Sequence, residues 1–242
     1  MNNRMKKFSD DPRRWLVAHR GDREGGAENT LDSFRFAVKS GALFAECDIQ
    51  FTRDLVPVVI HDDSLKRLCD LALHVSLLDL IDLKELCYPY FTLLTLHKLM
   101  AWLKGNPQLT LFVEIKPDIR KRLDDDDIAA RLAALIPEAV VSQIVLISES
   151  GGILNACRTH LSCPVGWVAE GNEQAESPLD YVFMPHSEAA MIDGWHERDV
   201  KVGLYTVNSA ATAVELMDAG ADLIETNHFS KMVDESSRDT RF

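Results

Sequence analysis

The chain has 242 residues, of which 46% are hydrophobic and 26% charged, and its formal net charge is −12 at pH 7. This length and hydrophobic content suit a single domain, and α/β barrels often reach this size as one domain. The strong negative charge argues against non-specific binding to nucleic acid or to anionic membrane surfaces. We therefore expect one domain over residues 1–242 that acts on a small molecule and binds no nucleic acid.

The sequence carries no sign of export or of a membrane span. Lys6 and Lys7 are followed by polar residues instead of the apolar core of a signal peptide, and no apolar run approaches the length of a span. The five cysteines lack the paired spacing of a zinc site and are typical of reduced thiols. We expect a cytoplasmic protein without stable membrane insertion, and its oligomeric state stays open.

Short apolar runs alternate with helical patterns along the chain. Strands are predicted at 15–20, 44–51, 57–61, 109–116, 143–148, 164–169, 181–185, 201–207 and 222–226. Helices are predicted at 30–40, 95–104, 126–136, 150–160, 187–197 and 209–219. Such alternation predicts a parallel sheet with right-handed crossovers. If 57–61 is a hairpin strand paired with 44–51, eight strands remain, which predicts a (β/α)₈ TIM barrel with a small rim insertion at about 62–94, after the second strand.

Two charged pairs stand inside apolar, strand-like runs. Glu46 and Asp48 are two residues apart, as are Glu114 and Lys116, so each pair lies on one face of its strand. Buried carboxylates are costly unless they pair with cations or hold a metal. Glu46, Asp48 and Glu114 offer hard oxygen ligands, which favour one divalent cation, Mg²⁺ or Ca²⁺, with Mn²⁺ possible. Cys47 should face the helices on the opposite side.

Two basic side chains accompany the carboxylates, and both suit an anionic ligand. Arg20 offers a planar fork for a phosphate, and Lys116 offers a compact charge. Together with a dication they exceed the three carboxylates by one positive charge, which a phosphodiester would neutralise. Structural salt bridges between these groups are the alternative explanation. All of these residues lie at the carboxyl ends of predicted strands, and these ends form the active face of barrel enzymes.

His19 and His61 each end an apolar strand next to this cluster. Histidine exchanges a proton near neutral pH, so two of them beside a metal-bound phosphate could act as general base and general acid. Which of the two is the base stays open, because that depends on how the ligand lies. The remaining histidines are expected at the surface or in the core, although His186 and His228 could reach the mouth of the barrel. Trp167 and Glu170, after the strand at 164–169, are weaker candidates for its lining.

These residues stand in a series of motifs that resembles the glycerophosphodiester phosphodiesterase family. The resemblance extends from residue 16 to about 229. Its motifs are Val17-Ala18-His19-Arg20-Gly21, Glu28-Asn29-Thr30, Glu46-Cys47-Asp48, Pro57-Val58-Val59-Ile60-His61-Asp62-Asp63, Val113-Glu114-Ile115-Lys116-Pro117, Tyr205-Thr206-Val207-Asn208 and Gly220-Ala221-Asp222-Leu223-Ile224.

The resemblance implies a barrel of the phospholipase C-like phosphodiesterase type. It implies metal-dependent hydrolysis of glycerophosphodiesters to sn-glycerol 3-phosphate and an alcohol. Carried over, His19 and His61 would be the acid–base pair, and Arg20 and Lys116 would bind the phosphate. The metal would be held by Glu46, Asp48 and Glu114. Glu28 would support the site by orienting Arg20, and Tyr205 would line the substrate pocket.

The sequence departs from the family pattern at several positions outside these seven core residues. Leu55 replaces the usual glycine of a turn, and a bulky residue tolerates φ > 0 poorly, so a different turn is expected. Tyr205 replaces a tryptophan, and Asn227 follows Thr226 where aspartate is more common. We expect these departures to affect the choice of alcohol and not the chemistry of the seven residues.

Two other functions are compatible with the sequence. The apolar segment from Cys87 to Leu94 lies in the rim insertion and could cover a lipid-like substrate, which would indicate lysophospholipase D-like activity. A barrel that binds a phosphorylated ligand without turnover is the non-catalytic alternative. The leaving alcohol and the physiological metal stay open.

Overall fold

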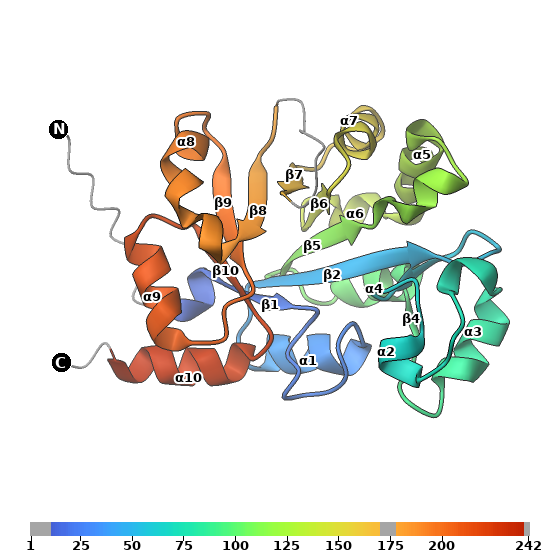
Figure 1. The fold of residues 1–242 in the computed structure, drawn as a ribbon, viewed down its shortest axis with the longest axis horizontal. Coiled ribbons are helices and arrows are strands. Elements are labelled where there is room, and N and C mark those ends of the chain that lie inside the picture. Colours follow the sequence, from blue (N-terminus) through green and yellow to red (C-terminus); the bar gives the residue numbers. More distant parts are fainter. Residues whose placement is uncertain (1–10, 170–177, 240–242) are drawn as a thin grey trace.

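The structure, a computed structural model, describes residues 11–169 and 178–239, without the side chains of 237–239. Eight parallel strands close into a barrel, because β1 pairs with β10 on one side and with β2 on the other (Figure 1). These strands are β1 (Leu16–His19), β2 (Phe44–Phe51), β5 (Thr110–Ile115), β6 (Ile144–Ser148), β7 (Val165–Val168), β8 (Tyr181–Pro185), β9 (Lys201–Tyr205) and β10 (Leu223–Thr226). The predicted (β/α)₈ barrel is confirmed, while its status as a single domain stays a prediction.

The helices lie outside the barrel. They are α1 (Leu31–Lys39), α4 (Leu96–Leu103), α5 (Asp125–Leu135), α6 (Glu138–Val141), α7 (Gly151–His160), α8 (Ile192–His196), α9 (Ala210–Asp218) and α10 (Phe229–Asp239). Helices α1, α4, α5, α7 and α9 begin within one residue of a predicted start, whereas α6 and α10 were not predicted. The side chains of Thr30 and Ser209 accept hydrogen bonds from the first turns of α1 and α9, as N-caps do. In place of the predicted helix at 187–197 the chain forms the 3₁₀ segment η4 (His186–Met191), within which Glu188 has non-helical dihedral angles, and then α8.

The predicted rim insertion is a small unit with its own apolar core. Strand β3 (Pro57–Val59) pairs antiparallel with β2, as predicted, and β4 (Leu94–Thr95) pairs with β3. Between them lie α2 (Lys66–Cys69), the 3₁₀ turn η2 (Val75–Leu77) and α3 (Leu80–Cys87), which the sequence pattern did not predict. Figure 1 shows these elements beside the tip of β2, at the right of the view. The insertion core is formed by Val58, Ile60, Leu65, Cys69, Val75, Leu83, Cys87 and Leu93.

The turn between β2 and β3 corrects the expectation for Leu55. Leu55 has φ of 62°, so this residue adopts the left-handed conformation that glycine usually provides. Its N–H donates to the carbonyl oxygen of Thr52, and the Thr52 N–H donates to the carbonyl oxygen of Val56. The Leu55 side chain also packs on the main core. These contacts offset the steric cost of a left-handed leucine.

Alternation along the strands separates two apolar layers. The barrel interior is filled by Val17, Phe112, Val145, Ile147, Val168, Phe183 and Leu223. Gly203 is needed there, because a Cβ atom at this position would lie 2.4 Å from the ring of Phe183. Cys47 instead belongs to the outer core between strands and helices, as expected. The apolar interior ends below the carboxyl ends of the strands, which leaves that end of the barrel to polar side chains.

Two further expectations have structural outcomes. All five cysteines are free, in agreement with the expected thiols. Within residues 11–169 and 178–239, we find no helix with the length and hydrophobicity needed to span a lipid bilayer.

Candidate active site

The strand register brings the two charged pairs together at the carboxyl end of the barrel. Asp48 on β2 lies opposite Glu114 on β5, and Glu46 lies opposite His19 on β1. One ligand atom from each of Glu46, Asp48 and Glu114 lies within 4.8 Å of the others, and all three residues are buried. Glu46 and Asp48 lie on one face of β2 because they are two residues apart. Pairing of β5 with β2 then adds Glu114 and completes a compact carboxylate cluster.

The carboxylate cluster fits a divalent cation. Oε1 of Glu46 is buried without a hydrogen-bond partner in the part of the chain that the structure describes. Burial and the neighbouring Asp48 and Glu225 carboxylates raise the pKa of Glu46 well above its usual range. Burial also raises the pKa of Glu114 to about 7. Carboxylates held together at such a cost are typical of a metal site, and oxygen ligands suit Mg²⁺, Ca²⁺ or Mn²⁺.

Asp48 is the anion on which both predicted phosphate-binding cations converge. Nζ of Lys116 lies 3.0 Å from its Oδ1 and also contacts Glu114, while Nε of Arg20 lies 3.0 Å from its Oδ2. Burial alone would raise the pKa of Asp48, but Lys116 and Arg20 outweigh burial and hold this pKa well below its usual range. Asn29 adds a hydrogen bond from Nδ2 to Oδ2 at 2.9 Å. Asp48 is therefore ionised and rigidly held, and the salt bridges of the alternative explanation are present.

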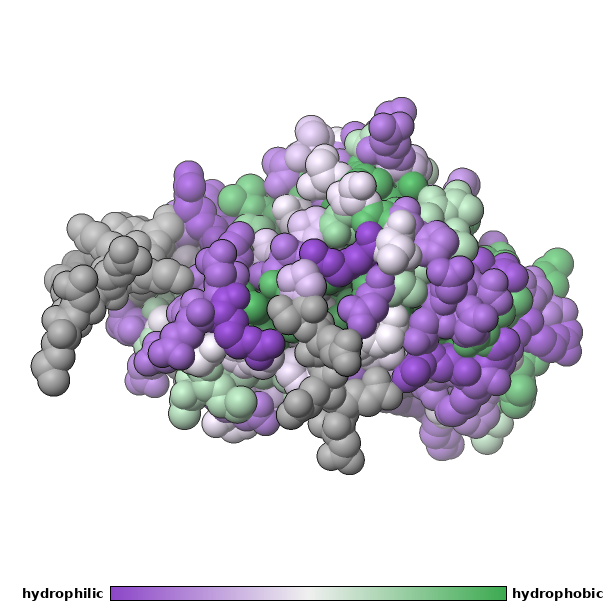
Figure 2. Space-filling view, turned by 90° about the horizontal axis from the view of Figure 1, so that it is seen from above, coloured by the Kyte–Doolittle hydropathy of each residue, from purple (hydrophilic) through white to green (hydrophobic). Residues whose placement is uncertain are grey.

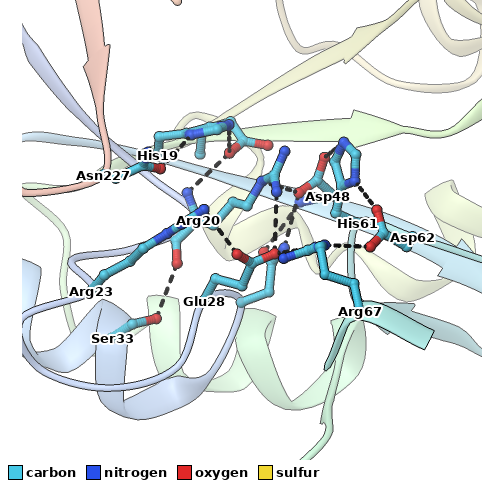
Figure 3. A network of polar contacts seen from close by, with 12 residues as sticks. His19, Arg20, Arg23, Glu28, Ser33, Asp48, His61, Asp62, Arg67 and Asn227 are labelled. Atoms are coloured by element: carbon cyan, nitrogen blue, oxygen red, sulfur yellow. Dashed lines mark hydrogen bonds and ion pairs between the residues drawn. The ribbon is translucent and has the colours of Figure 1, made fainter. Parts of the chain in front are cut away.

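The two histidines flank the carboxylate cluster, His19 from the end of β1 and His61 from the segment just after β3 (Figure 3). Nε2 of His19 lies 3.8 Å from Oε2 of Glu46, and Nε2 of His61 lies 4.0 Å from Oδ1 of Asp48. On the other side of each ring, Nδ1 has a different partner. His19 contacts Oδ1 of Asn227 at 2.9 Å, whereas His61 contacts Oδ1 of Asp62 at 2.5 Å.

These partners give the histidines different proton affinities. Both acceptors are oxygen atoms, so each Nδ1 donates its proton to its partner, and Nε2 is the atom of each ring that faces the cluster. Burial, reinforced by the charge of Arg20, lowers the pKa of His19 to about 4. Burial also lowers the pKa of His61, but the Asp48 and Asp62 carboxylates oppose that change. His19 is thus the neutral imidazole. In His61 the two neighbouring carboxylates stabilise the charged imidazolium form.

Glu28 lies at the centre of a network on the rim of the site. It contacts Nη1 of Arg20 at 3.1 Å, Nη2 of Arg67 at 2.6 Å and Nη2 of Arg23 at 2.8 Å (Figure 3). Nε of Arg67 also lies 2.6 Å from Oδ2 of Asp62, the partner of His61. The contact between Glu28 and Arg20 agrees with its expected orienting position. Arg67 comes from α2, so the rim insertion is tied directly to the site.

The weaker candidates have mixed outcomes. Tyr205 ends β9 and packs on the apolar residues of the barrel interior, so its ring does lie at the mouth. His186 contacts the carbonyl oxygen of Tyr205 at 3.3 Å, and His228 pairs with Glu24 on the rim. The expectation that Trp167 lines the mouth is wrong, because this residue packs in the outer layer against Trp195. Glu170 lies outside the described residues.

Sequence reasoning missed several residues that complete the site. The expectation that the departures leave the seven residues untouched is wrong for Asn227, because its side chain contacts His19. Asn29 and Asp62 stand inside the recognised motifs, but their contacts are visible only in the structure. Glu225 is buried in β10 two residues after Leu223, on the barrel face. Its period-2 spacing from an inward-facing residue was the available signal.

The raised pKa values predict how the metal-free protein responds to pH. Burial raises the pKa of Glu114 to about 7 and that of Glu225 to about 8, both above the unfolded value of 4.5. The folded protein therefore binds more protons than the unfolded chain, and the stabilising contribution is lost as pH rises through these values. We expect the free energy of unfolding to fall as pH rises from the unfolded pKa of 4.5 to about 7 for Glu114 and about 8 for Glu225, by up to ~1.4 kcal/mol per pH unit for each group. The depressed pKa of His19 acts in the opposite direction, chiefly at lower pH.

Urea unfolding in the presence of a chelator, at several pH values in this range, measures this slope. Glu225→Gln should make it shallower because one of the two titrating groups is removed. A saturating divalent cation should flatten the slope by holding the carboxylates ionised. A profile that is flat without metal would contradict the prediction.

Comparison with known proteins agrees with this geometry. Residues 19–231 match the model of the glycerophosphoryl diester phosphodiesterase family. YhdW of Bacillus subtilis, a candidate glycerophosphodiester phosphodiesterase, is 26% identical over 231 residues, which cover 88% of this chain and 94% of that protein. Human glycerophosphodiester phosphodiesterase 1 is 47% identical over a shorter stretch of 62 residues, which covers 23% of this chain and 19% of the human protein.

Two solved structures show the same fold. A glycerophosphodiester phosphodiesterase from Parabacteroides distasonis aligns with a TM-score of 0.78 at 21% identity, over 94% of this chain and 98% of that chain. An Oleispira antarctica phosphodiesterase in complex with its product sn-glycerol-3-phosphate aligns with a TM-score of 0.76 at 20% identity, over 93% and 96% of the two chains. Because the family match extends over most of the barrel, the chain belongs to the glycerophosphoryl diester phosphodiesterase family and is a phosphoric diester hydrolase.

Proposed function

We propose that this protein hydrolyses small glycerophosphodiesters to sn-glycerol 3-phosphate and an alcohol in a metal-dependent reaction, with His19 as general base and His61 as general acid. The observation that carries this proposal is the placement of two Nε2 atoms on either side of the carboxylate cluster, 3.8 Å from Glu46 and 4.0 Å from Asp48. A phosphodiester held between them would present its attacking and leaving oxygens to different rings.

The partners of the two rings support this assignment. His19 is neutral and donates its Nδ1 proton to Asn227, so the Nε2 lone pair is free to take a proton from the attacking hydroxyl. His61 donates to the Asp62 carboxylate, which favours the imidazolium that must protonate the leaving alcohol. The glycerol 2-hydroxyl is the attacking group in the first step, forming a P–O bond as the P–O bond to the alcohol breaks. Water then opens the cyclic phosphate, with the two histidines exchanging roles.

The remaining residues position the phosphoryl group. Glu46, Asp48 and Glu114 would hold one divalent cation, Mg²⁺ or Ca²⁺, with Mn²⁺ possible, and the ion would supply Lewis-acid charge to the phosphoryl oxygens. Arg20 and Lys116 approach the cluster from its two sides and would bind those oxygens as well. Glu28 keeps the Arg20 guanidinium in place, and Tyr205 offers an aromatic wall for the substrate.

Turnover of glycerophosphocholine by chelator-stripped protein tests the proposal. Mg²⁺, Ca²⁺ and Mn²⁺ are restored separately, and glycerol 3-phosphate is measured with a coupled dehydrogenase. We expect product only with metal, and none from Glu114→Ala under any condition. Metal-independent product would contradict the cation. If no product forms with any metal, from glycerophosphocholine, other glycerophosphodiesters or lysophospholipids, the non-catalytic barrel would be favoured.

A second candidate, lysophospholipase D-like activity, is favoured by the surface of the rim insertion. Five of the six exposed large hydrophobic side chains among the described residues belong to it, namely Leu73, Leu77, Ile81, Tyr88 and Tyr90. Hydrophobic side chains also gather at the right edge of the molecule in Figure 2, on the side where the insertion lies. An acyl chain leaving the barrel mouth would find an apolar surface there.

The double variant Ile81→Lys and Tyr88→Lys tests this second activity. Both side chains are more than half exposed, so the fold should tolerate the change. We expect kcat/KM for lysophosphatidylcholine to fall about 10-fold or more, since each apolar contact of this size contributes about 1.5–3 kcal/mol. Turnover of glycerophosphocholine should stay unchanged. Met191→Lys, exposed on another part of the surface, is the control, and equal effects on both substrates would count against an acyl-binding role.

A further inference from the structure

Glu225 is a buried carboxylate to which the proposed mechanism assigns no role. It lies on β10 opposite Val17 of β1, two residues deeper in the barrel than the level of His19 and Asn227. Its side chain therefore belongs to the floor beneath the candidate site. Only 3% of Glu225 is exposed, and its Oε1 has no hydrogen-bond partner within the described ranges of the chain. A carboxylate in this position is costly unless something neutralises it.

The electrostatic neighbours of Glu225 are the residues of the cation cluster. Its charge acts on Glu46, and the charges of Glu114 and Asp48 act on it. Glu225 thus faces the cluster from the side of β10, outside the group of three carboxylates from β2 and β5 whose oxygens lie within 4.8 Å of one another. Oε1 of Glu46 is unpartnered in the same way, which leaves two buried oxygens, one from β2 and one from β10 on either side of β1, without a protein donor in the described part of the structure.

The charge of the site changes when Glu225 is included. Among the described residues, two basic side chains, Arg20 and Lys116, contact this set of four buried carboxylates, and both contact Asp48. The expectation of one excess positive charge in the metal-filled site counted three carboxylates. With Glu225 ionised, a single dication brings the site to neutrality. The additional carboxylate therefore matches the charge of the ion.

We infer that Glu225 is a fourth carboxylate of the cation site, which contacts the ion from the floor of the barrel and favours Ca²⁺ over Mg²⁺. This inference rests on the proposed function, in which the cluster holds a divalent cation. Ca²⁺ accepts six to eight oxygen ligands in flexible geometry and binds more tightly as ligand charge increases. Mg²⁺ retains several waters and is usually held by one or two carboxylates. A fourth carboxylate should therefore contribute much more to Ca²⁺ affinity than to Mg²⁺ affinity.

Calorimetric titration of chelator-stripped protein with Ca²⁺ alone and Mg²⁺ alone tests the inference without substrate. Two variants separate contact from a distant field effect. Glu225→Gln keeps the shape and removes the charge, while Glu225→Asp keeps the charge and shortens the reach by one methylene. We expect both to weaken Ca²⁺ binding by about 10- to 100-fold, as loss of a supporting metal-site residue does, with a smaller change for Mg²⁺. Thermal unfolding confirms that each variant is folded.

Glu149→Gln serves as the control, because Glu149 also acts through its charge on Glu114 but follows the end of β6 at the rim. If Glu225 acts only through its field, Glu225→Asp will bind like the wild type and Glu225→Gln will resemble Glu149→Gln for both ions. That result, or unchanged Ca²⁺ affinity in both Glu225 variants, would overturn the inference. Failure of the wild type to bind any divalent cation would instead refute the metal-dependent function itself.

Discussion

Replacement of His19 or His61 by alanine should lower kcat for glycerophosphocholine by about 10²- to 10⁴-fold, the range usual for a general base or acid. The two variants should differ when the alcohol is a good leaving group. With glycerophospho-p-nitrophenol the leaving oxygen departs without a proton, so His61→Ala should recover much of its lost rate of p-nitrophenol release. Formation of glycerol 3-phosphate should stay slow in this variant, because His61 is the base when water opens the cyclic phosphate. His19→Ala should not recover, because the attacking hydroxyl still has to lose its proton. A stopped assay for both products measures these rates.

His74 provides a matched control for this pair of variants. It forms a contact of 2.9 Å with Asp63 in the rim insertion and so resembles the pair of His61 and Asp62, but it lies outside the site. His74→Ala should retain nearly full activity on both substrates. Recovery of His19→Ala instead of His61→Ala with the activated substrate would reverse the assignment. Near-normal turnover by either variant would remove that residue from the acid–base pair.

Asp48→Asn should abolish turnover and weaken metal binding together, because this carboxylate is both a ligand candidate and the anchor of two cations. It is fully buried and pairs with Lys116 and Arg20. Removal of its charge leaves both cations without this partner. Loss of one member of a buried ion pair costs about 3–5 kcal/mol of stability. Since its pKa is held below the usual range, this contribution is present at neutral pH and is lost only in strong acid.

Calorimetry with Ca²⁺ and Mg²⁺ and urea unfolding test Asp48→Asn on the same protein preparation. Metal affinity should fall by at least about 10-fold. Asp118→Asn is the control, because it removes the same charge from an exposed residue that pairs with Lys121. Asp118→Asn should change neither affinity nor turnover. Normal metal affinity in Asp48→Asn would exclude Asp48 as a ligand, and unchanged stability would show that its ion pairs add nothing net.

The strand positions and the core of the site were readable from the sequence because both depend on local periodicity. Spacing of two residues placed Glu46 with Asp48 and Glu114 with Lys116, and the barrel brings these pairs together at 4.8 Å or less between the carboxylate oxygens. Apolar runs before His19 and His61 placed both at strand ends. The helices α2, α3, α6 and α10 were not predicted, nor was the left-handed Leu55, whose turn is stabilised by contacts that a sequence pattern does not report.

What surrounds the core of the site was decided by the tertiary structure. The partner of His19 is 208 residues away in the sequence, and the contact exists only because closure of the barrel brings β1 beside β10. The same closure places Glu225 under the cluster. Arg67 reaches Glu28 from an insertion with its own core. Sequence periodicity thus determined which chemical groups face the site, because side-chain direction is a local property. The charge balance of the site and the different proton affinities of His19 and His61 depend on packing between distant segments. No local sequence pattern encodes such packing.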